Sequence, residues 1–470
     1  MSRCRPVTFV AVMILAILML GIGFLGCELE TQEPPVRTEQ TYHDTYMASI
    51  GNSLTAGFMS GGLEKAGQAA CFPNQLSQVI LGREMQMPIV DSPGLGSESG
   101  MTPLFINESG DLTREPLTVD PLELLLNLTY PAPYDNLGIP GATTHQLLTT
   151  LFADEVGNPM FDLILRNAAL PSGGTAIEEL ERLTPDIITA WAGNNEILGG
   201  ALSGSPQSDD PEAPGYVVPL ADYQQAFRTL CDRIAALQPK MVAIANIPPI
   251  TDIPYTRFFG TGSIPGINRW IMEEDLDDDG DPVQLVLLHA PISGCPGCFL
   301  PSCQFDPATP CDTIPANATL TVAETALVTD AIAAYNDFLA TEVASRGWAL
   351  VDAHEAFLQL PRSPNVQELN VAFAWQVDPL SGIGEQNHYS AFTLDGIHPS
   401  EKGSAHVANL FLQAFNETYE TSYPLIDEEA VVNVSGFERA PVAAKSANGI
   451  NITQEGRRGL RAMVEMMQGR

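Results

Sequence analysis

Four short apolar segments, separated by helical patterns, constrain the fold of this chain more than any other feature of its sequence. They cover residues 46–50, 186–191, 241–247 and 348–352. Each has the length and apolar character of a buried strand, and the first two run into Gly-Asn turns. Because strands that alternate with helices pair as a mostly parallel sheet with helices on both faces, the sequence predicts an α/β fold.

The segments between these runs carry the period of amphipathic helices. From Tyr223 to Leu237 apolar residues recur every three or four positions, and an Ala-rich helix is predicted over residues 322–346. A further helix over residues 401–415 closes the body. Ligands of such sheets bind beyond the carboxyl ends of the strands, which is where Ser53 and Asn195 stand.

Two long stretches interrupt this alternation, at about residues 85–135 and 251–319. Both are rich in Pro, Gly and Asp and are too long for ordinary connections, so we expect substantial loops or small lids near the site. The folded body is predicted to span residues 42–421. The tail of residues 422–470 follows no clear pattern.

Residues 1–27 read as an export signal or a membrane anchor that is not part of the fold. Two N-terminal arginines precede a run without charges that ends in Phe-Leu-Gly before Cys27, and this end resembles the bacterial lipobox. We expect lipidation at Cys27, because a polar linker of residues 28–41 follows it; an uncleaved membrane helix is the alternative. Either arrangement places the body outside the cytoplasm, and we expect an outer-membrane or periplasmic lipoprotein of the bacterial cell envelope.

The charge balance bears on the partners of the chain. It has 57 acidic residues against 22 lysines and arginines, a formal net charge of -35. Such a surface repels phosphate backbones, so nucleic acid is not an expected partner. The expected partners are a membrane, reached through the N-terminal anchor, and a small-molecule or polymeric substrate.

A cluster of four cysteines lies in the second insertion, at Cys295, Cys298, Cys303 and Cys311. In a cytosolic protein this spacing would suggest zinc, but an exported chain meets an oxidising environment in which disulfides persist. We therefore expect two local disulfides of undetermined connectivity, with a metal site as the alternative.

The same insertion contains a candidate calcium loop. Acidic residues alternate along it, at Asp275, Asp277, Asp279 and Asp281. Oxygen ligands at the first, third and fifth positions before a glycine resemble the start of a calcium-binding loop, although Val286 occupies the twelfth position, where Glu is usual. A structural calcium ion is one interpretation, and a plain acidic loop is the other.

Ser53 is the candidate nucleophile. It stands in a Gly turn between the first predicted strand and a predicted helix start, a geometry that exposes the hydroxyl above the sheet and leaves the backbone N–H free to donate. A serine that merely caps a helix would show the same local pattern. The candidate base is His398, three residues after Asp395, because this spacing lets the carboxylate bind one imidazole nitrogen while the other faces Ser53.

Two further segments supply donors for a developing oxyanion: the backbone N–H of Gly141 and the side-chain amide of Asn195. Taken in chain order, the segments around Ser53, Gly141, Asn195 and His398 resemble the four sequence blocks of the SGNH or GDSL-like hydrolase family, and most closely its long, lipoprotein-like bacterial members. The resemblance implies a three-layer α/β/α sandwich with a flavodoxin-like sheet.

The resemblance also implies the roles of these residues. It makes Ser53 the nucleophile, Asp395 and His398 the rest of the triad, and the donors of the oxyanion hole Ser53, Gly141 and Asn195. The chain departs from the family at Asn52 and Glu196, where Asp is usual. Neither position belongs to the triad, so we expect only a loss of supporting hydrogen bonds and a structural role for Asn52.

The sequence therefore predicts a serine hydrolase that cleaves acyl esters, of the esterase or lipase type, at the cell envelope. Lipids, small esters and acylated carbohydrates are the expected substrates, and no cofactor is required. A carbohydrate acetyl esterase, which would use the same residues, is the first alternative. A catalytically silent binding protein of the envelope is the second.

Overall fold

The structure is a computed structural model that describes most of the predicted body. The described residues are 45–98, 100–106, 112–167, 173–256, 259–260, 283–287, 317, 319–360, 375–377, 384–386 and 390–434. The predictions on the N-terminal anchor, Cys27, the linker, the cysteine cluster and the candidate calcium loop lie outside these residues. Among the helices that are described, none is long and apolar enough to cross a membrane.

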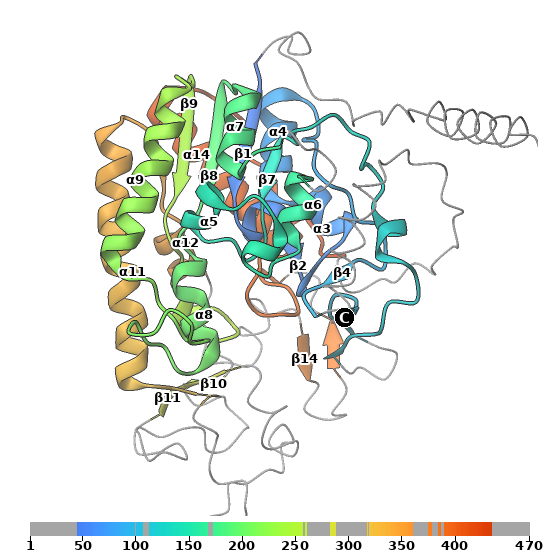
Figure 1. Cartoon of the computed structure of the whole chain (residues 1–470), viewed down its shortest axis with the longest axis vertical. Helices are drawn as coiled ribbons and strands as arrows, with labels where there is room; N and C mark the ends of the chain where they lie inside the picture. The colour runs from blue at the N-terminus through green and yellow to red at the C-terminus, as the bar shows by residue number, and fades with distance from the viewer. Residues whose placement is uncertain are drawn as a thin grey trace, which may run out of the picture.

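Five parallel strands form the central sheet (Figure 1). They are β1 (Met47–Gly51), β7 (Asn136–Gly138), β8 (Ile187–Trp191), β9 (Met241–Ala245) and β13 (Ala349–Val351). Their order across the sheet is β13-β9-β8-β1-β7, and every neighbouring pair is parallel. Counted along the chain this is the order 2-1-3-4-5 of flavodoxin-like sheets, so the predicted fold is confirmed.

Alternate residues of the strands point into two separate apolar layers. Ala48 and Ile50 of β1 belong to one hydrophobic cluster, whereas Met47 belongs to the other. The first cluster is covered by α5 (Thr144–Thr149), α7 (Ala176–Leu183), α9 (Leu220–Ala236) and α11 (Val322–Ser345). The second is covered by α4 (Phe72–Leu81) and α14 (Glu401–Tyr419). Helices therefore pack on both faces of the sheet, and the three helices predicted from their periodicity are all present.

The fifth strand, β7, is the one strand of the central sheet that the sequence did not predict. It has only three residues, and its first, Asn136, is polar. Asn136 pairs with Ser49 of β1, and its amide donates to the carbonyl of Thr55 at 2.8 Å. A strand this short, with a polar residue that serves tertiary contacts, has no apolar run by which to recognise it.

The remaining elements are short and lie mostly in the connections. Residues 53–135 contain α2 (Ser53–Ala56), β2 (Phe58–Met59), β3 (Gly62–Leu63), α3 (Lys65–Ala70), β4 (Leu95–Gly96), β5 (Phe105–Ile106), β6 (Leu112–Thr113) and η2 (Pro121–Leu124). Further along the chain follow η3 (Ala153–Glu155), α6 (Met160–Leu165), α8 (Asn195–Ser203), η4 (Ile250–Asp252), β10 (Phe259–Gly260), β11 (Val283–Val286), β12 (Thr319–Thr321), α12 (Ala353–Gln359), β14 (Trp375–Val377), β15 (Gly384–Gln386) and η6 (Glu428–Ala430).

Part of the predicted tail packs against the body. Residues 422–434 follow α14 and return along it, because the amide of Asn409 donates to the carbonyl of Ile426 at 2.9 Å and the amide of Asn433 donates to the carbonyl of Ser390 at 2.8 Å. Residues 435–470 lie outside the described part of the chain. The C-terminal boundary of the body therefore falls later than the predicted residue 421.

Candidate active site

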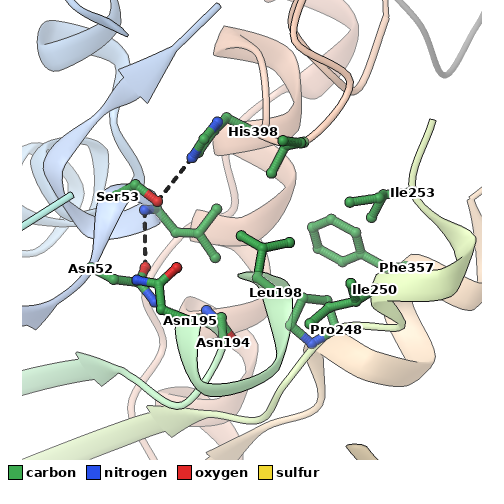
Figure 2. A pocket seen from close by; sticks show the side chains of 12 residues that line it. Asn52, Ser53, Asn194, Asn195, Leu198, Pro248, Ile250, Ile253, Phe357 and His398 are labelled. Atoms are coloured by element: carbon green, nitrogen blue, oxygen red, sulfur yellow. Dashed lines mark hydrogen bonds between the residues drawn. The ribbon is translucent and has the colours of Figure 1, made fainter. Parts of the chain in front are cut away.

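The carboxyl ends of the parallel strands meet at one edge of the sheet, and the candidate residues gather there (Figure 2). Ser53 follows β1 and Asn195 follows β8, and these strands pair so that Gly51 lies opposite Trp191. The loop that carries His398 precedes α14 and reaches the same edge. It brings His398 into contact with Ser53, 345 positions away in the chain.

Two glycines allow α2 to start close above the sheet. A Cβ on Gly51 would collide with the side chain of Thr55 and with the carbonyl of Trp191. A Cβ on Gly138 of β7 would collide with the backbone of Ala56. Small residues are therefore required on both strands that lie beneath the turn.

Ser53 is the first residue of α2. Asn52 caps this helix, because its side-chain oxygen accepts a hydrogen bond from the N–H of Leu54 at 3.1 Å. The Asn52 side chain therefore stabilises the start of α2. Since the first N–H groups of a helix have no partner within it, the N–H of Ser53 is available to an acceptor above the sheet.

His398 joins Ser53 to Asp395. Its Nε2 atom lies 2.8 Å from Ser53 Oγ, and its Nδ1 atom lies 2.8 Å from Asp395 Oδ2. All three residues are buried. A hydroxyl, an imidazole and a carboxylate in this order can move the hydroxyl proton onto the imidazole and hold the resulting cation.

The carboxylate of Asp395 receives four hydrogen bonds besides that of the imidazole. Oδ1 accepts from the Thr393 hydroxyl at 3.0 Å and from the N–H groups of Ile397 at 2.9 Å and His398 at 3.0 Å, and Oδ2 accepts from the N–H of Gly61 at 2.6 Å. Burial raises the pKa of Asp395, but the charge of His398 and the hydrogen bonds from His398 and from the N–H of Ile397 outweigh it and lower the pKa to about 2. Asp395 is therefore an anion at neutral pH.

The β2–β3 hairpin, which follows α2, covers the imidazole. The ring of Phe58 lies 4.9 Å from that of His398, centroid to centroid. Strand β4 of the first insertion pairs with β3, and Arg114 from the same insertion donates to the carbonyl of Gly61 at 3.2 Å. Through these contacts, residues of the insertion at 85–135 lie beside the site.

Asn195 bonds the residue that follows Gly141, but of these two candidate donors only Asn195 lines the cavity. The Asn195 side chain lines the cavity beside Ser53, and one of its amide hydrogens is donated to the carbonyl of Ala142 at 2.8 Å. Because an amide nitrogen carries two hydrogens, a second one remains for a ligand. Gly141, in the turn after β7, has a left-handed φ of 79°, is exposed, and is not among the residues that line the cavity.

Glu196 makes a supporting hydrogen bond at the position where we expected one to be lost. Its side chain is buried and accepts from the N–H of Thr144, at the start of α5, at 2.6 Å. Burial raises the pKa of Glu196, and its bond to Thr144 opposes that rise. The expectation was wrong because the Glu side chain still reaches the segment that follows Gly141.

The cavity beside Ser53 has a polar end and an apolar wall (Figure 2). Its polar end is formed by Asn52, Ser53, Asn194, Asn195 and His398. The wall consists of Leu54, Leu198, Pro248, Ile250, Ile253, Phe357 and Ile397. Such a surface can bind an apolar group while a carbonyl is held at the polar end.

Comparison with known proteins assigns the chain to a family. The model of the family described as GDSL-like Lipase/Acylhydrolase matches residues 47–411, from the start of β1 into α14. The chain belongs to this family. The predicted resemblance is confirmed, and the match contains Ser53, Gly141, Asn195, Asp395 and His398. Membership supports a hydrolase of acyl groups.

Two solved structures resemble this GDSL-like hydrolase at low identity. One is described as BT4096, a gut microbial diltiazem-metabolizing enzyme, with 13% identity, a TM-score of 0.32, and coverage of 79% of this chain and 47% of the other. The second is the acetyl xylan esterase AlAXEase, with 13% identity, a TM-score of 0.25, and coverage of 59% and 78%. The hydrolase thus spans about half the length of the first structure. No curated protein matches its sequence.

The described part of this GDSL-like hydrolase offers neither a metal cluster nor a reactive thiol. There, no group of three or more His, Cys, Asp or Glu residues is placed to hold a metal ion. Cys71 and Cys231 are buried free thiols, and burial raises the pKa of each to about 12. A thiol with so high a pKa is a poor nucleophile at neutral pH.

Several residues of the site had no signal in the sequence. Leu198, Pro248 and Phe357 follow three different strands of the sheet. They share no sequence motif, and their only common feature is a position beyond the carboxyl end of a strand. Thr393 and Gly61 hold Asp395 from segments with no recognisable motif. A buried contact between distant segments of the chain cannot be deduced from local pattern.

Proposed function

We propose that this protein is a serine ester hydrolase in which Ser53 attacks the acyl carbonyl, His398 moves the proton and Asp395 orients the imidazole. The observation that carries the proposal is the unbroken hydrogen-bonded chain from Ser53 Oγ through both nitrogens of His398 to the anionic Asp395. It supplies a nucleophile, a base and an orienting group, which ester hydrolysis at neutral pH requires together.

In the first half of the reaction, Ser53 Oγ forms a bond to the carbonyl carbon as His398 Nε2 takes the hydroxyl proton. The carbonyl electron pair moves onto the oxygen, and the anion accepts hydrogen bonds from the N–H of Ser53 and the free amide hydrogen of Asn195. Gly141 is a third donor on the family resemblance alone. The bond to the leaving alcohol then breaks, and the alcohol oxygen takes the proton from His398.

In the second half, water replaces the alcohol. His398 removes a proton from the water as its oxygen attacks the acyl carbon of the ester on Ser53. The bond to Ser53 Oγ breaks, and the proton returns from His398 to the serine. Asp395 remains ionised throughout and stabilises the imidazolium in both halves.

The proposal is tested by assaying the full-length protein with chromogenic esters of increasing acyl length beside acetylated polysaccharides. We expect release of product from at least one member of the ester series. Preference for acetylated polysaccharide would favour the carbohydrate acetyl esterase. Binding of a substrate with no turnover of any member would overturn the proposal in favour of a silent binding protein.

Asn195 is expected to act on the transition state more than on the bound substrate. Its free amide hydrogen is aimed at an oxygen that becomes negative only during attack, so Asn195→Ala should lower kcat by about 10² to 10³ with little change in KM. Steady-state kinetics on one ester measures both constants. Asn416→Ala, which removes an amide that does not line the cavity, is the control for a general effect on the fold. A loss of only a few-fold in Asn195→Ala would contradict the role.

We also propose a location in the cell envelope, with the body anchored through a lipid on Cys27. Support comes only from the N-terminal sequence, in which two arginines and an apolar run precede Cys27. We expect cells that express the protein to incorporate labelled fatty acid into it, and Cys27→Ser to abolish the incorporation. Labelling that survives this substitution would rule the anchor out.

A further inference from the structure

The segment that carries Gly141 is a tight turn after β7. The N–H of Ala142 donates to the carbonyl of Ile139 at 3.1 Å, which closes the turn. Pro140 occupies its second position, and Gly141, at the third, has a φ of 79°. A proline followed by a glycine with positive φ defines a type II turn. The same two residues also fit a type I turn, which differs by roughly 150° to 170° in the two dihedral angles beside the central peptide.

The central peptide, between Pro140 and Gly141, decides where the N–H of Gly141 points. The peptide is trans, so its C=O and its N–H point in opposite directions. In the observed turn no described residue accepts a hydrogen bond from this N–H, and the glycine is exposed. A change to the type I turn would turn the peptide over. The carbonyl of Pro140 would then replace the N–H and would repel a negative oxygen.

Asn158 holds the central peptide by its carbonyl. The side-chain amide of Asn158 donates to the carbonyl of Pro140 at 2.8 Å. The orientation of this amide is fixed in turn, because its oxygen accepts from the N–H of Met160 at 3.0 Å and its nitrogen must therefore face Pro140. Since the N–H of Gly141 points away from the carbonyl that Asn158 binds, the amide favours the turn in which this N–H is free.

Both ends of the turn are bound to the neighbourhood of the nucleophile. The N–H of Ile139 donates to the carbonyl of Gly51 at 2.9 Å, two residues before Ser53. The carbonyl of Ala142 accepts from the amide of Asn195 at 2.8 Å. These two bonds hold the turn as a whole in place, but they leave the orientation of its central peptide open.

We propose that Asn158 is a positioning residue of the oxyanion hole. By binding the carbonyl of Pro140 it keeps the central peptide in the orientation that offers the N–H of Gly141 to the oxyanion. The inference rests on the proposed function, because it takes Gly141 as the third donor of an ester hydrolase. It gives Asn158 an effect on the transition state although its side chain does not line the cavity beside Ser53.

Asn158→Asp is the variant that tests the inference, because it keeps the shape of the side chain and replaces its donor by an acceptor. One carboxylate oxygen can still accept from the N–H of Met160. The other would repel the carbonyl of Pro140 and attract the N–H of the turned-over peptide. We expect kcat of the full-length protein on a chromogenic ester to fall by about 10- to 100-fold, with KM within about threefold of wild type, because an oxyanion donor is lost from most molecules.

Asn158→Ala separates positioning from a merely structural role. Alanine removes both hydrogen bonds of the side chain, but it offers nothing to the turned-over peptide. Because the Pro-Gly pair still favours the observed turn, kcat should fall by only about two- to fivefold. A structural role predicts the opposite order, since alanine removes more contacts than aspartate does.

Asn416→Asp is the matched control. Its amide also donates to a carbonyl while its oxygen accepts a backbone N–H, both of Tyr423, and it does not line the cavity. This variant should keep wild-type kcat. Melting temperatures of all the variants show whether each is folded.

A double-variant cycle tests the path through Gly141. Gly141→Ala should also favour the turned-over peptide, because alanine is strained at a φ of 79°. If both substitutions act on one peptide, the double variant with Asn158→Asp should lose about as much kcat as the more impaired single variant, rather than the product of the two losses.

Three results would overturn the inference and leave the ester hydrolase intact. They are a loss of less than about tenfold in kcat for Asn158→Asp, a lower kcat in Asn158→Ala than in Asn158→Asp, and losses that multiply in the double variant. Absence of turnover of every ester by the wild-type protein would instead overturn the proposed function, and this inference with it.

Discussion

Ser53→Ala should lower kcat for ester hydrolysis by about 10⁴- to 10⁶-fold, because it removes the atom that forms the acyl intermediate. Binding and the oxyanion donors remain, so a slow residual rate above that in water is expected. The side chain of Ser53 contributes little to the fold: its hydroxyl bonds His398, and Asn52 supplies the cap of α2. The melting temperature should therefore stay within a few degrees of wild type.

The measurement is kcat on a chromogenic ester, together with labelling by a serine-directed phosphonate and mapping of the labelled peptide. Ser203→Ala is the matched control, since the Ser203 hydroxyl donates to the carbonyl of Gly200 and accepts from the N–H of Ser205, and the residue does not line the cavity. It should keep wild-type activity and labelling. Activity of Ser53→Ala within tenfold of wild type would show that another group attacks the substrate.

The fold was predictable from the sequence because β1, β8 and β9 are buried on both faces of the sheet, and β13 is apolar although its Leu350 is exposed. The continuous apolar runs at β1, β8 and β9 are the direct consequence of helices on either side of the sheet. The strand β7 escaped prediction because it begins with the polar Asn136 and ends with a glycine, whereas β13, which is as short and also lies at an edge, is apolar throughout. The place of β7 beside β1 is fixed by pairing with Ser49 and by the close packing of Gly138 against α2, which no local pattern encodes.

The polar residues of the candidate site were predictable, whereas the surface that recognises a substrate was not. Ser53, Asn195 and His398 stand in short segments whose chemistry and order resemble those of a known family, and the structure brings the three to one cavity. The residues of the apolar wall carry no polar or reactive group that a sequence motif could reveal. Pro248 and Phe357 look like any other apolar residues until the topology brings the carboxyl ends of β9 and β13 to the same edge of the sheet as that of β1.

Asp395→Asn should lower kcat by about 10³- to 10⁴-fold, although the side chain keeps its shape. Oδ2 of Asp395 faces two donors, the N–H of Gly61 and Nδ1 of His398. An amide NH₂ in that place would favour the tautomer in which Nδ1 accepts, and Nε2 would then carry the proton and could no longer take one from Ser53. With the amide turned the other way, its NH₂ would face the N–H groups of Ile397 and His398 instead. Both orientations lose a hydrogen bond, and both lose the anion that stabilises the imidazolium.

The lowered pKa of Asp395 adds a readout that separates this explanation from a general loss of structure. Because the folded-state pKa is about 2 and the ordinary value is 3.8, the carboxylate stabilises the fold above pH 4, and this contribution is lost as the pH falls toward 2. The Asn variant lacks it, so the difference in unfolding free energy between wild type and Asp395→Asn should shrink by roughly 1 kcal/mol from pH 5 to pH 3. Denaturant unfolding at the two pH values measures this difference.

As a control, Asp186→Asn alters a carboxylate at the opposite end of β8, where it bonds Tyr46 and Lys240, and should spare kcat. If Asp395→Asn kept kcat within tenfold of wild type, His398 would not depend on Asp395 for its orientation, and the proton path proposed from Ser53 would have to be abandoned.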